Sequence, residues 1–136
     1  MAKDILVTES LTDSMIKAGA KLIERLDAKN SEVKSAFWLY FSEEKTWKLL
    51  VASPLVDSEG PRNYYKRIVK ANTVASIEEE ILSLNDVGVI NAKIQIVQLL
   101  KKFMIGTGDS ISGIRFSKNT INGVFIDDAY IYRSNP

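Results

Sequence analysis

The chain has 136 residues, of which 46% are hydrophobic and 26% charged, as is typical of one globular domain with a substantial core. Its 18 basic and 17 acidic residues nearly cancel, so the net charge gives no indication of nucleic-acid or membrane binding. The absence of histidine and cysteine excludes disulfides, thiol nucleophiles, Ser–His and Cys–His pairs and nearly all zinc sites.

These absences favour a non-enzymatic protein with no cofactor and no bound metal. No apolar run approaches the roughly 18 residues that a membrane-spanning helix needs. The first ten residues, MAKDILVTES, carry acids and hydroxyls where a signal peptide has a long apolar core. The sequence therefore predicts a cytoplasmic protein that makes no contact with a membrane.

Residues 10–28 form the first predicted element, a helix that Ser10 and Asp13 would cap and whose apolar residues fall on one stripe. The next segment, SAFWLYFSEEKTWKLLVASP, predicts a β-hairpin, because two aromatic-rich runs flank a polar loop. A loop centred on Glu44 and Lys45 would place Tyr40 opposite Leu49. Its runs do not alternate apolar and polar residues, so both faces of the hairpin are expected to be apolar. One face carries Phe37, Leu39, Phe41, Leu50 and Ala52, and the other carries Trp38, Tyr40, Trp47, Leu49 and Val51.

The middle of the chain predicts three helices and one short strand. Pro54 would end the second strand of the hairpin, and residues 55–60 would form a loop. A helix is expected to begin at Pro61, because proline suits the first helical position. Further elements are expected as a short helix over 76–84, a strand over 86–90 and a helix over 92–104. The inward residues of the helix that begins at Pro61 would be Tyr65, Ile68, Val69 and Asn72.

The last segment, ISGIRFSKNTINGVFIDDAYIYR, predicts a second hairpin, because Asn122-Gly123 is a strong turn signal. With this turn, Ser117 lies opposite Asp128 and Arg115 lies opposite Tyr130. A competing turn at Lys118-Asn119 keeps Arg115 and Asp128 on one face but moves them apart. The first register gives an apolar face of Ile114, Phe116, Phe125, Ala129 and Ile131, with a Lys118–Asp127 pair toward one end, and a polar face of Arg115, Ser117, Asn119, Asp128, Tyr130 and Tyr132.

This order of elements predicts a single α+β domain over 1–136, in which two hairpins form a mostly antiparallel sheet packed against three to four helices. If those helices cover only one face, the other face exposes an aromatic surface larger than monomers usually keep. A homodimer or a protein partner would then cover it. The leading hypothesis is therefore a binding module whose interface residues are Trp38, Tyr40 and Trp47, with Tyr130 and Tyr132 on the same face.

Several motifs resemble a family of small uncharacterised bacterial proteins. They are W-x-Y at 38–40, LLVASP shortly after Trp47, G-P-R-x-x-Y at 60–65, and the closing GIRFS, ING and IDDAYIYR. The resemblance covers most of the chain. It implies a small bacterial cytoplasmic protein, and it implies no activity and no site residues.

Two other kinds of site are possible. Arg115, Asp128, Tyr130 and Tyr132 could line a polar pocket that binds a small molecule or serves a carboxylate-dependent enzyme. The alternative for these residues is a structural salt bridge beside half-buried tyrosines. A basic helix stripe could bind nucleic acid with the help of Tyr64 and Tyr65, although the near-zero net charge disfavours this. The stripe consists of Arg62, Lys66, Arg67 and Lys70.

Three further patterns favour structural explanations. Asp127 and Asp128, together with Asp109, could hold a metal, but neighbours on a regular strand point to opposite faces. The acids at 78–80 suit the positive end of a helix. Gly106-Thr107-Gly108 follows a predicted helix and does not open one, so it is interpreted as a helix stop and a loop.

Overall fold

The structure is a computed structural model that describes residues 10–74, 81–91, 93, 94, 96–98, 111, 113–121 and 123–134. These residues form a single α+β domain with a five-stranded mixed sheet, as the sequence predicts. Its helices are α2 (Asp13–Ala28), α3 (Pro54–Glu59), α4 (Pro61–Asn72) and the short 3₁₀ helix η1 (Leu84–Asp86). Its strands are β1 (Ser35–Phe41), β2 (Thr46–Ala52), β3 (Val87–Ile90), β4 (Ile114–Ile121) and β5 (Val124–Ser134).

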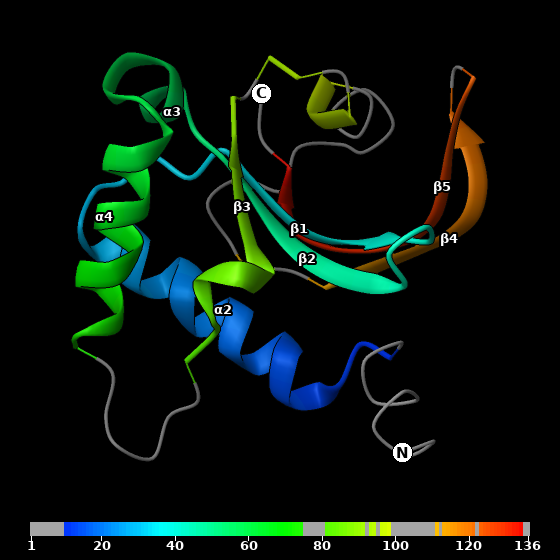
Figure 1. The fold of residues 1–136 in the computed structure, drawn as a ribbon, viewed down its shortest axis with the longest axis horizontal. Coiled ribbons are helices and arrows are strands. Elements are labelled where there is room, and N and C mark those ends of the chain that lie inside the picture. The colour runs from blue at the N-terminus through cyan, green and yellow to red at the C-terminus, as the bar shows by residue number, and fades with distance from the viewer. Residues whose placement is uncertain are drawn as a thin grey trace.

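Strand β1 lies at the centre of the sheet, whose order is β3-β2-β1-β5-β4. The pairs β1–β2, β1–β5 and β4–β5 are antiparallel, and β2–β3 is parallel. Helices α2 and α4 lie on one side of the sheet, and the short helical segment 96–98 lies on the other (Figure 1). The chain itself therefore covers both faces of the first hairpin, which explains why AFWLYF does not alternate.

Each face of the sheet has its own core. On the side of α2 and α4, Trp38, Leu49 and Val51 pack against Leu22 and Ile23 of α2 and against other buried residues. The opposite face brings together Phe37, Leu50, Ala52, Val97, Phe116, Ile126, Ala129 and Ile131. The two apolar sets predicted for β1 and β2 match these two cores. Their register is shifted by two residues from the prediction, because Tyr40 pairs with Trp47 and Trp38 with Leu49.

Helix α2 is joined to the sheet through a buried hydroxyl. The Tyr132 hydroxyl accepts a hydrogen bond from Trp38 Nε1 at 2.8 Å and donates one to the Ile16 carbonyl at 2.5 Å. Gly19 makes this approach possible, since a Cβ at that position would lie 2.4 Å from the hydroxyl. The helix begins after Thr12, whose side chain accepts from the Met15 amide, rather than after the predicted cap Ser10.

Two predictions in the middle of the chain are wrong. Residues 54–59 form helix α3 instead of a loop, because Ser53 caps its first turn by accepting from the Leu55 amide and Pro54 takes the first helical position. Helix α4 also turns a different face inward. Its buried residues are Tyr64, Ile68 and Ala71, whereas Tyr65, Val69 and Asn72 are half-buried or exposed.

The second hairpin has the register predicted from Asn122-Gly123, with Ile121 opposite Val124 and Ser117 opposite Asp128. Its distal end departs from the predicted faces. Phe125 is 62% exposed, whereas Ile126 is 1% exposed and belongs to the core with Ala129. At this end Lys118 has a left-handed φ of 45° and interrupts the pairing of β4 with β5. The side chains of β5 therefore change which face of the sheet they point to, and the predicted pairing of Lys118 with Asp127 is absent.

Strand β3 confirms the short strand predicted near 86–90. Of the helix predicted over 92–104, residues 96–98 are helical and Asn91 accepts from the Lys93 amide, as a cap does. The helix predicted over 76–84 is not formed in its described part, because residues 81–83 are not helical and Ser83 caps the 3₁₀ helix η1 that begins at Leu84. The start of that predicted helix, the acids at 78–80, Asp109 and the glycine pair at 106–108 lie outside the described residues. In the described part of the chain, we find no helix with the length and apolarity that crossing a membrane requires.

Candidate functional site

A cavity of about 560 Å³ opens where the end of α2, the loop before β1, the end of α3 and helix α4 come together. This volume lies within the range of small-molecule pockets. Helix α4 packs against both α2 and α3, which fixes the three walls. The lining residues are predominantly polar and basic: Lys29, Ser31, Glu59, Asn63, Lys66, Arg67 and Lys70.

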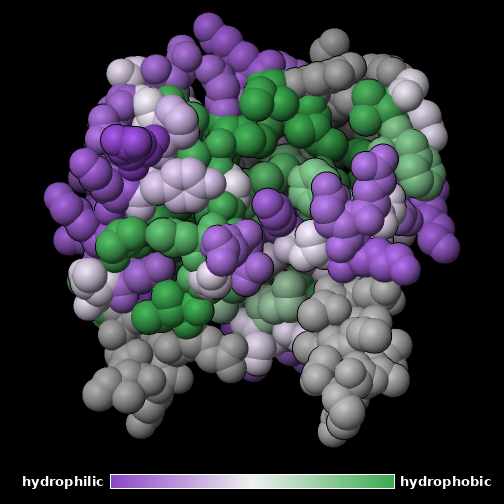
Figure 2. Space-filling view, in the orientation of Figure 1, coloured by the Kyte–Doolittle hydropathy of each residue, from purple (hydrophilic) through white to green (hydrophobic). Residues whose placement is uncertain are grey.

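Helix α4 supplies one wall of this basic pocket. Asn63, Lys66, Arg67 and Lys70 stand at positions i, i+3, i+4 and i+7, so they form one stripe along the helix. The stripe faces the pocket because the neighbouring face of α4, centred on Tyr64, is buried against the sheet. Hydrophilic residues also dominate the outer edge of the molecule where α4 lies (Figure 2).

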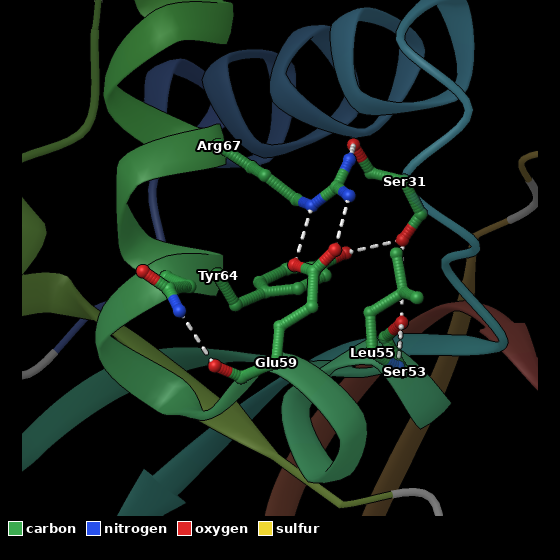
Figure 3. A network of polar contacts seen from close by, with 7 residues as sticks. Ser31, Ser53, Leu55, Glu59, Tyr64 and Arg67 are labelled. Atoms are coloured by element: carbon green, nitrogen blue, oxygen red, sulfur yellow. Dashed lines mark hydrogen bonds and ion pairs between the residues drawn. The ribbon is translucent and has the colours of Figure 1, made fainter.

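Arg67 is held in place by a carboxylate from the end of α3. Its Nε donates to Glu59 Oε2 at 2.9 Å and its Nη2 to Glu59 Oε1 at 2.5 Å, a two-pronged ion pair (Figure 3). Hydrogen bonds from the Arg67 guanidinium hold the pKa of Glu59 below its ordinary value. The same pairing raises the pKa of Arg67. Both groups therefore stay charged at neutral pH.

Ser31 forms the buried floor of the pocket. Its carbonyl accepts from the Tyr64 hydroxyl at 2.9 Å and from Ser53 Oγ at 3.2 Å, and its own hydroxyl receives a long 3.5 Å contact from Arg67 Nη1 (Figure 3). The residues on either side, Asn30 and Glu32, both have left-handed backbones, with φ of 53° and 51°. Such conformations persist where surrounding contacts fix them, and here the two bonds to Ser31 do so.

Tyr64 acts as a neutral donor in this floor. Burial raises its pKa to about 12, so the phenol keeps its proton and continues to donate to the Ser31 carbonyl at neutral pH. The hydroxyl is thus committed to the fold and has no proton to exchange with a ligand.

The pocket is strongly positive although the chain is nearly neutral. It is lined by four cations and a single acid, and that acid is bound to Arg67. Within the part of the chain that the structure describes, Lys29, Lys66 and Lys70 form no ion pair. Their charges are therefore available to a ligand.

The sequence identified part of this pocket. Of the basic stripe predicted to bind nucleic acid, Lys66, Arg67 and Lys70 line the cavity, and Arg62 does not. The predicted stacking tyrosines are committed elsewhere, since Tyr64 is buried and the Tyr65 hydroxyl donates to the Val87 carbonyl at 2.9 Å. Sequence reasoning missed four lining residues, Lys29, Ser31, Glu59 and Asn63, because no local pattern connects the end of α2 with α3 and α4.

The two tryptophans of the predicted aromatic interface are buried inside the chain. Trp38 is 0% and Trp47 3% exposed, and Tyr132 is buried as well, because α2 packs over this face of the sheet. Tyr40 and Tyr130 are half-buried, and Tyr40 packs against Trp47 with ring centroids 5.3 Å apart. A partner that used Trp38 as an anchor would first have to displace α2, whose Gly19 lies against the Trp38 ring.

Arg115 and Asp128 do come together, as the register predicts. Arg115 donates to both carboxylate oxygens of Asp128, at 2.6 and 2.5 Å, and Ser117 Oγ adds a third bond at 2.9 Å. The guanidinium also lies over the Trp47 ring, 5.3 Å from its centroid. Tyr132 is not part of this group, since its hydroxyl is bonded within the core.

The Asp128 carboxylate lines a cavity of about 300 Å³ together with Asp127. Burial disfavours its charge, but the hydrogen bonds from Arg115 and Ser117 outweigh this and keep its pKa below the ordinary value. A carboxylate with a lowered pKa is a weak base, so these contacts favour a structural salt bridge over acid–base chemistry. The two aspartates share this cavity because the alternation of β5 changes phase beside them. Even so, no group of three or more acids that could hold a metal occurs among the described residues.

Comparison with models of protein families, with curated proteins and with solved structures gave no match to this chain. The basic pocket is therefore interpreted from its own geometry.

Proposed function

We propose that the protein is a non-enzymatic binding module whose ligand is a small anion held in the basic pocket. The observation that supports this proposal is a cavity of about 560 Å³ lined by four cations and one acid, in a chain whose net charge is only +1. Three of these cations, Lys29, Lys66 and Lys70, form no ion pair with any residue that the structure describes. An anion that entered would restore the balance and gain charge-assisted hydrogen bonds.

The residues of the pocket suit binding better than catalysis. The chain has no histidine or cysteine, and Glu59, the one carboxylate among the described lining residues, is a weak base because Arg67 lowers its pKa. Ser31 is buried, and its hydroxyl has no general base beside it among the lining residues. The pocket therefore offers donors and positive charge without a nucleophile and base pair.

This proposal keeps the binding module expected from the sequence and moves its site. The aromatic face is covered by α2, whereas the pocket is open and, among the residues that the structure describes, its three lysines form no ion pair. The ligand that the pocket suits is a small anion instead of a protein partner.

Amide chemical-shift mapping tests the proposal. The ¹⁵N-labelled protein is titrated with sulfate and phosphate at constant ionic strength, and the same titration is run on the double variant Lys66→Glu, Lys70→Glu. We expect saturable shifts at residues 29–31 and 59–70 in the wild-type protein and none in the variant. Lys17→Glu changes one exposed lysine of α2 outside the pocket and serves as the control. Shifts that fail to saturate, or that persist in the double variant, contradict the proposal.

A further inference from the structure

The basic pocket holds more positive charge than a monoanion can balance. Lys29 enters from the end of α2, and Lys66 and Lys70 enter from α4, so the lysines approach from two sides. Of the pocket's four cations, Arg67 alone has an acidic partner among the described residues. An occupant that satisfies three unpaired lysines at once must carry several negative charges, or several anionic oxygens pointing in different directions.

The donor types favour phosphoryl oxygens over carboxylates. A planar carboxylate is best matched by the planar fork of arginine, but the fork of Arg67 formed by Nε and Nη2 is already occupied by Glu59. The remaining cations are lysines, which act as point charges with no planar preference. A tetrahedral phosphoryl group presents oxygens in several directions, so separate ammonium groups can each reach one.

The walls of the pocket disfavour a nucleic-acid strand. Single-stranded nucleic acids are held by aromatic platforms beside a basic groove, and the described residues that line this cavity include no aromatic side chain. Tyr64 of α4 is fully buried beneath Ser31, with its hydroxyl bonded to the Ser31 carbonyl. The pocket thus has the charge that a phosphate backbone needs and lacks the stacking surface that its bases need.

We propose that the occupant is a small phosphoryl anion with more than one negative charge, such as a phosphoanhydride or a multiply phosphorylated small molecule. This inference rests on the proposed function and names the class of its ligand. Lys29, Lys66 and Lys70 bind the phosphoryl oxygens. Arg67 is a positioning and recognition residue, because Glu59 fixes its guanidinium and leaves Nη1 directed toward Ser31 at the floor of the pocket.

Isothermal titration calorimetry with three probes tests this inference. The probes are inorganic pyrophosphate, citrate as a carboxylate anion of similar charge, and an oligothymidylate. Each is titrated into the wild-type protein, into the double variant Lys66→Gln, Lys70→Gln and into the control Lys17→Gln. Glutamine keeps a helix propensity close to that of lysine, so the variants change charge without weakening the helix.

We expect pyrophosphate to bind most tightly and the double variant to weaken it by at least about tenfold, because two charge-assisted bonds are lost. The control should leave the affinity unchanged. If citrate binds as tightly as pyrophosphate and is weakened by the same variant, the pocket is an anion site without phosphoryl preference, and this inference falls while the proposed function stands. Tighter binding of the oligothymidylate, with a steep salt dependence, also overturns it. If none of the probes binds, both proposals fail.

Discussion

Replacing Gly19 with alanine tests how α2 is joined to the sheet. Gly19 lies on the buried side of α2, where an added Cβ would be 2.4 Å from the Tyr132 hydroxyl and 3.0 Å from Trp38 Nε1. The hydroxyl cannot move away freely, because it accepts from Trp38 and donates to the Ile16 carbonyl. The substitution must therefore push α2 away from the sheet or break at least one of these bonds.

The magnitude follows from three contributions. Overpacking a close contact costs about 1–3 kcal/mol, and a lost buried hydrogen bond adds roughly 1 kcal/mol. Alanine in a helix regains about 1 kcal/mol relative to glycine. We expect Gly19→Ala to lower the free energy of unfolding by about 2 kcal/mol. In a domain of this size that corresponds to a fall in Tm of roughly 6–8 °C.

A double-mutant cycle isolates the contact. Tyr132→Phe removes the clashing oxygen and should itself cost about 1–3 kcal/mol, since two buried groups lose their partner. In that background Gly19→Ala should cost less than about 1 kcal/mol, because the closest remaining atoms are 3.0 and 3.1 Å away. Urea unfolding of the four proteins gives the coupling energy. An equal cost of Gly19→Ala in both backgrounds, or a stabilised single variant, refutes the reasoning.

Three further predictions concern burial and charge. Both tryptophans are at most 3% exposed, so acrylamide should quench their fluorescence weakly at every protein concentration. Strong quenching that fades as the protein is concentrated would instead indicate that self-association covers the aromatic face. Asp27→Asn should lower the free energy of unfolding, measured in urea, by about 2 kcal/mol, because Arg133, whose side chain is 2% exposed, loses the carboxylate that accepts two of its hydrogen bonds. As a control, Glu24→Gln in the exposed Lys21–Glu24 pair should lower it by less than about 0.5 kcal/mol. The hydrogen bonds from Arg67 lower the pKa of Glu59 from its ordinary value of 4.5. The ion pair therefore stabilises the fold fully above about pH 4.5, and this stabilisation is lost as the pH falls through the lowered pKa of the folded state. The stability difference between wild type and Glu59→Gln should thus be constant from neutral pH to about pH 5 and shrink toward pH 3; a difference that does not depend on pH would contradict it.

The parts of the fold set by short-range patterns were predictable from the sequence. Asn122-Gly123 determines the register of the second hairpin, because a two-residue turn leaves one way to pair its strands. The two apolar faces of the first hairpin follow from side-chain alternation, which a shift of register by two residues leaves intact. Helix α3 could also have been predicted, since a serine followed by a proline is typical of the start of a helix as well as of the end of a strand.

The parts set by long-range packing were not predictable. The covering of both sheet faces depends on where α2 and the segment 96–98 pack, and no local pattern in the sequence predicts either position (Figure 1). The inward face of α4 depends on a hydrogen bond between residues far apart in the sequence. Tyr64 turns toward the core because its hydroxyl reaches the Ser31 carbonyl, 33 residues earlier in the chain.

The charge of the whole chain was a poor guide to the basic pocket. A net charge of +1 disfavoured nucleic-acid binding by the basic stripe, yet it records only a sum and not where the charges lie. Packing α4 against α2 and α3 gathers four cations around one cavity, and Glu59 is the one acid among the described residues that line it. That acid, Glu59, is used to fix Arg67 and does not cancel the lysines. A nearly neutral domain can thus hold a strongly positive pocket, because folding determines which charges share a surface and which are kept apart.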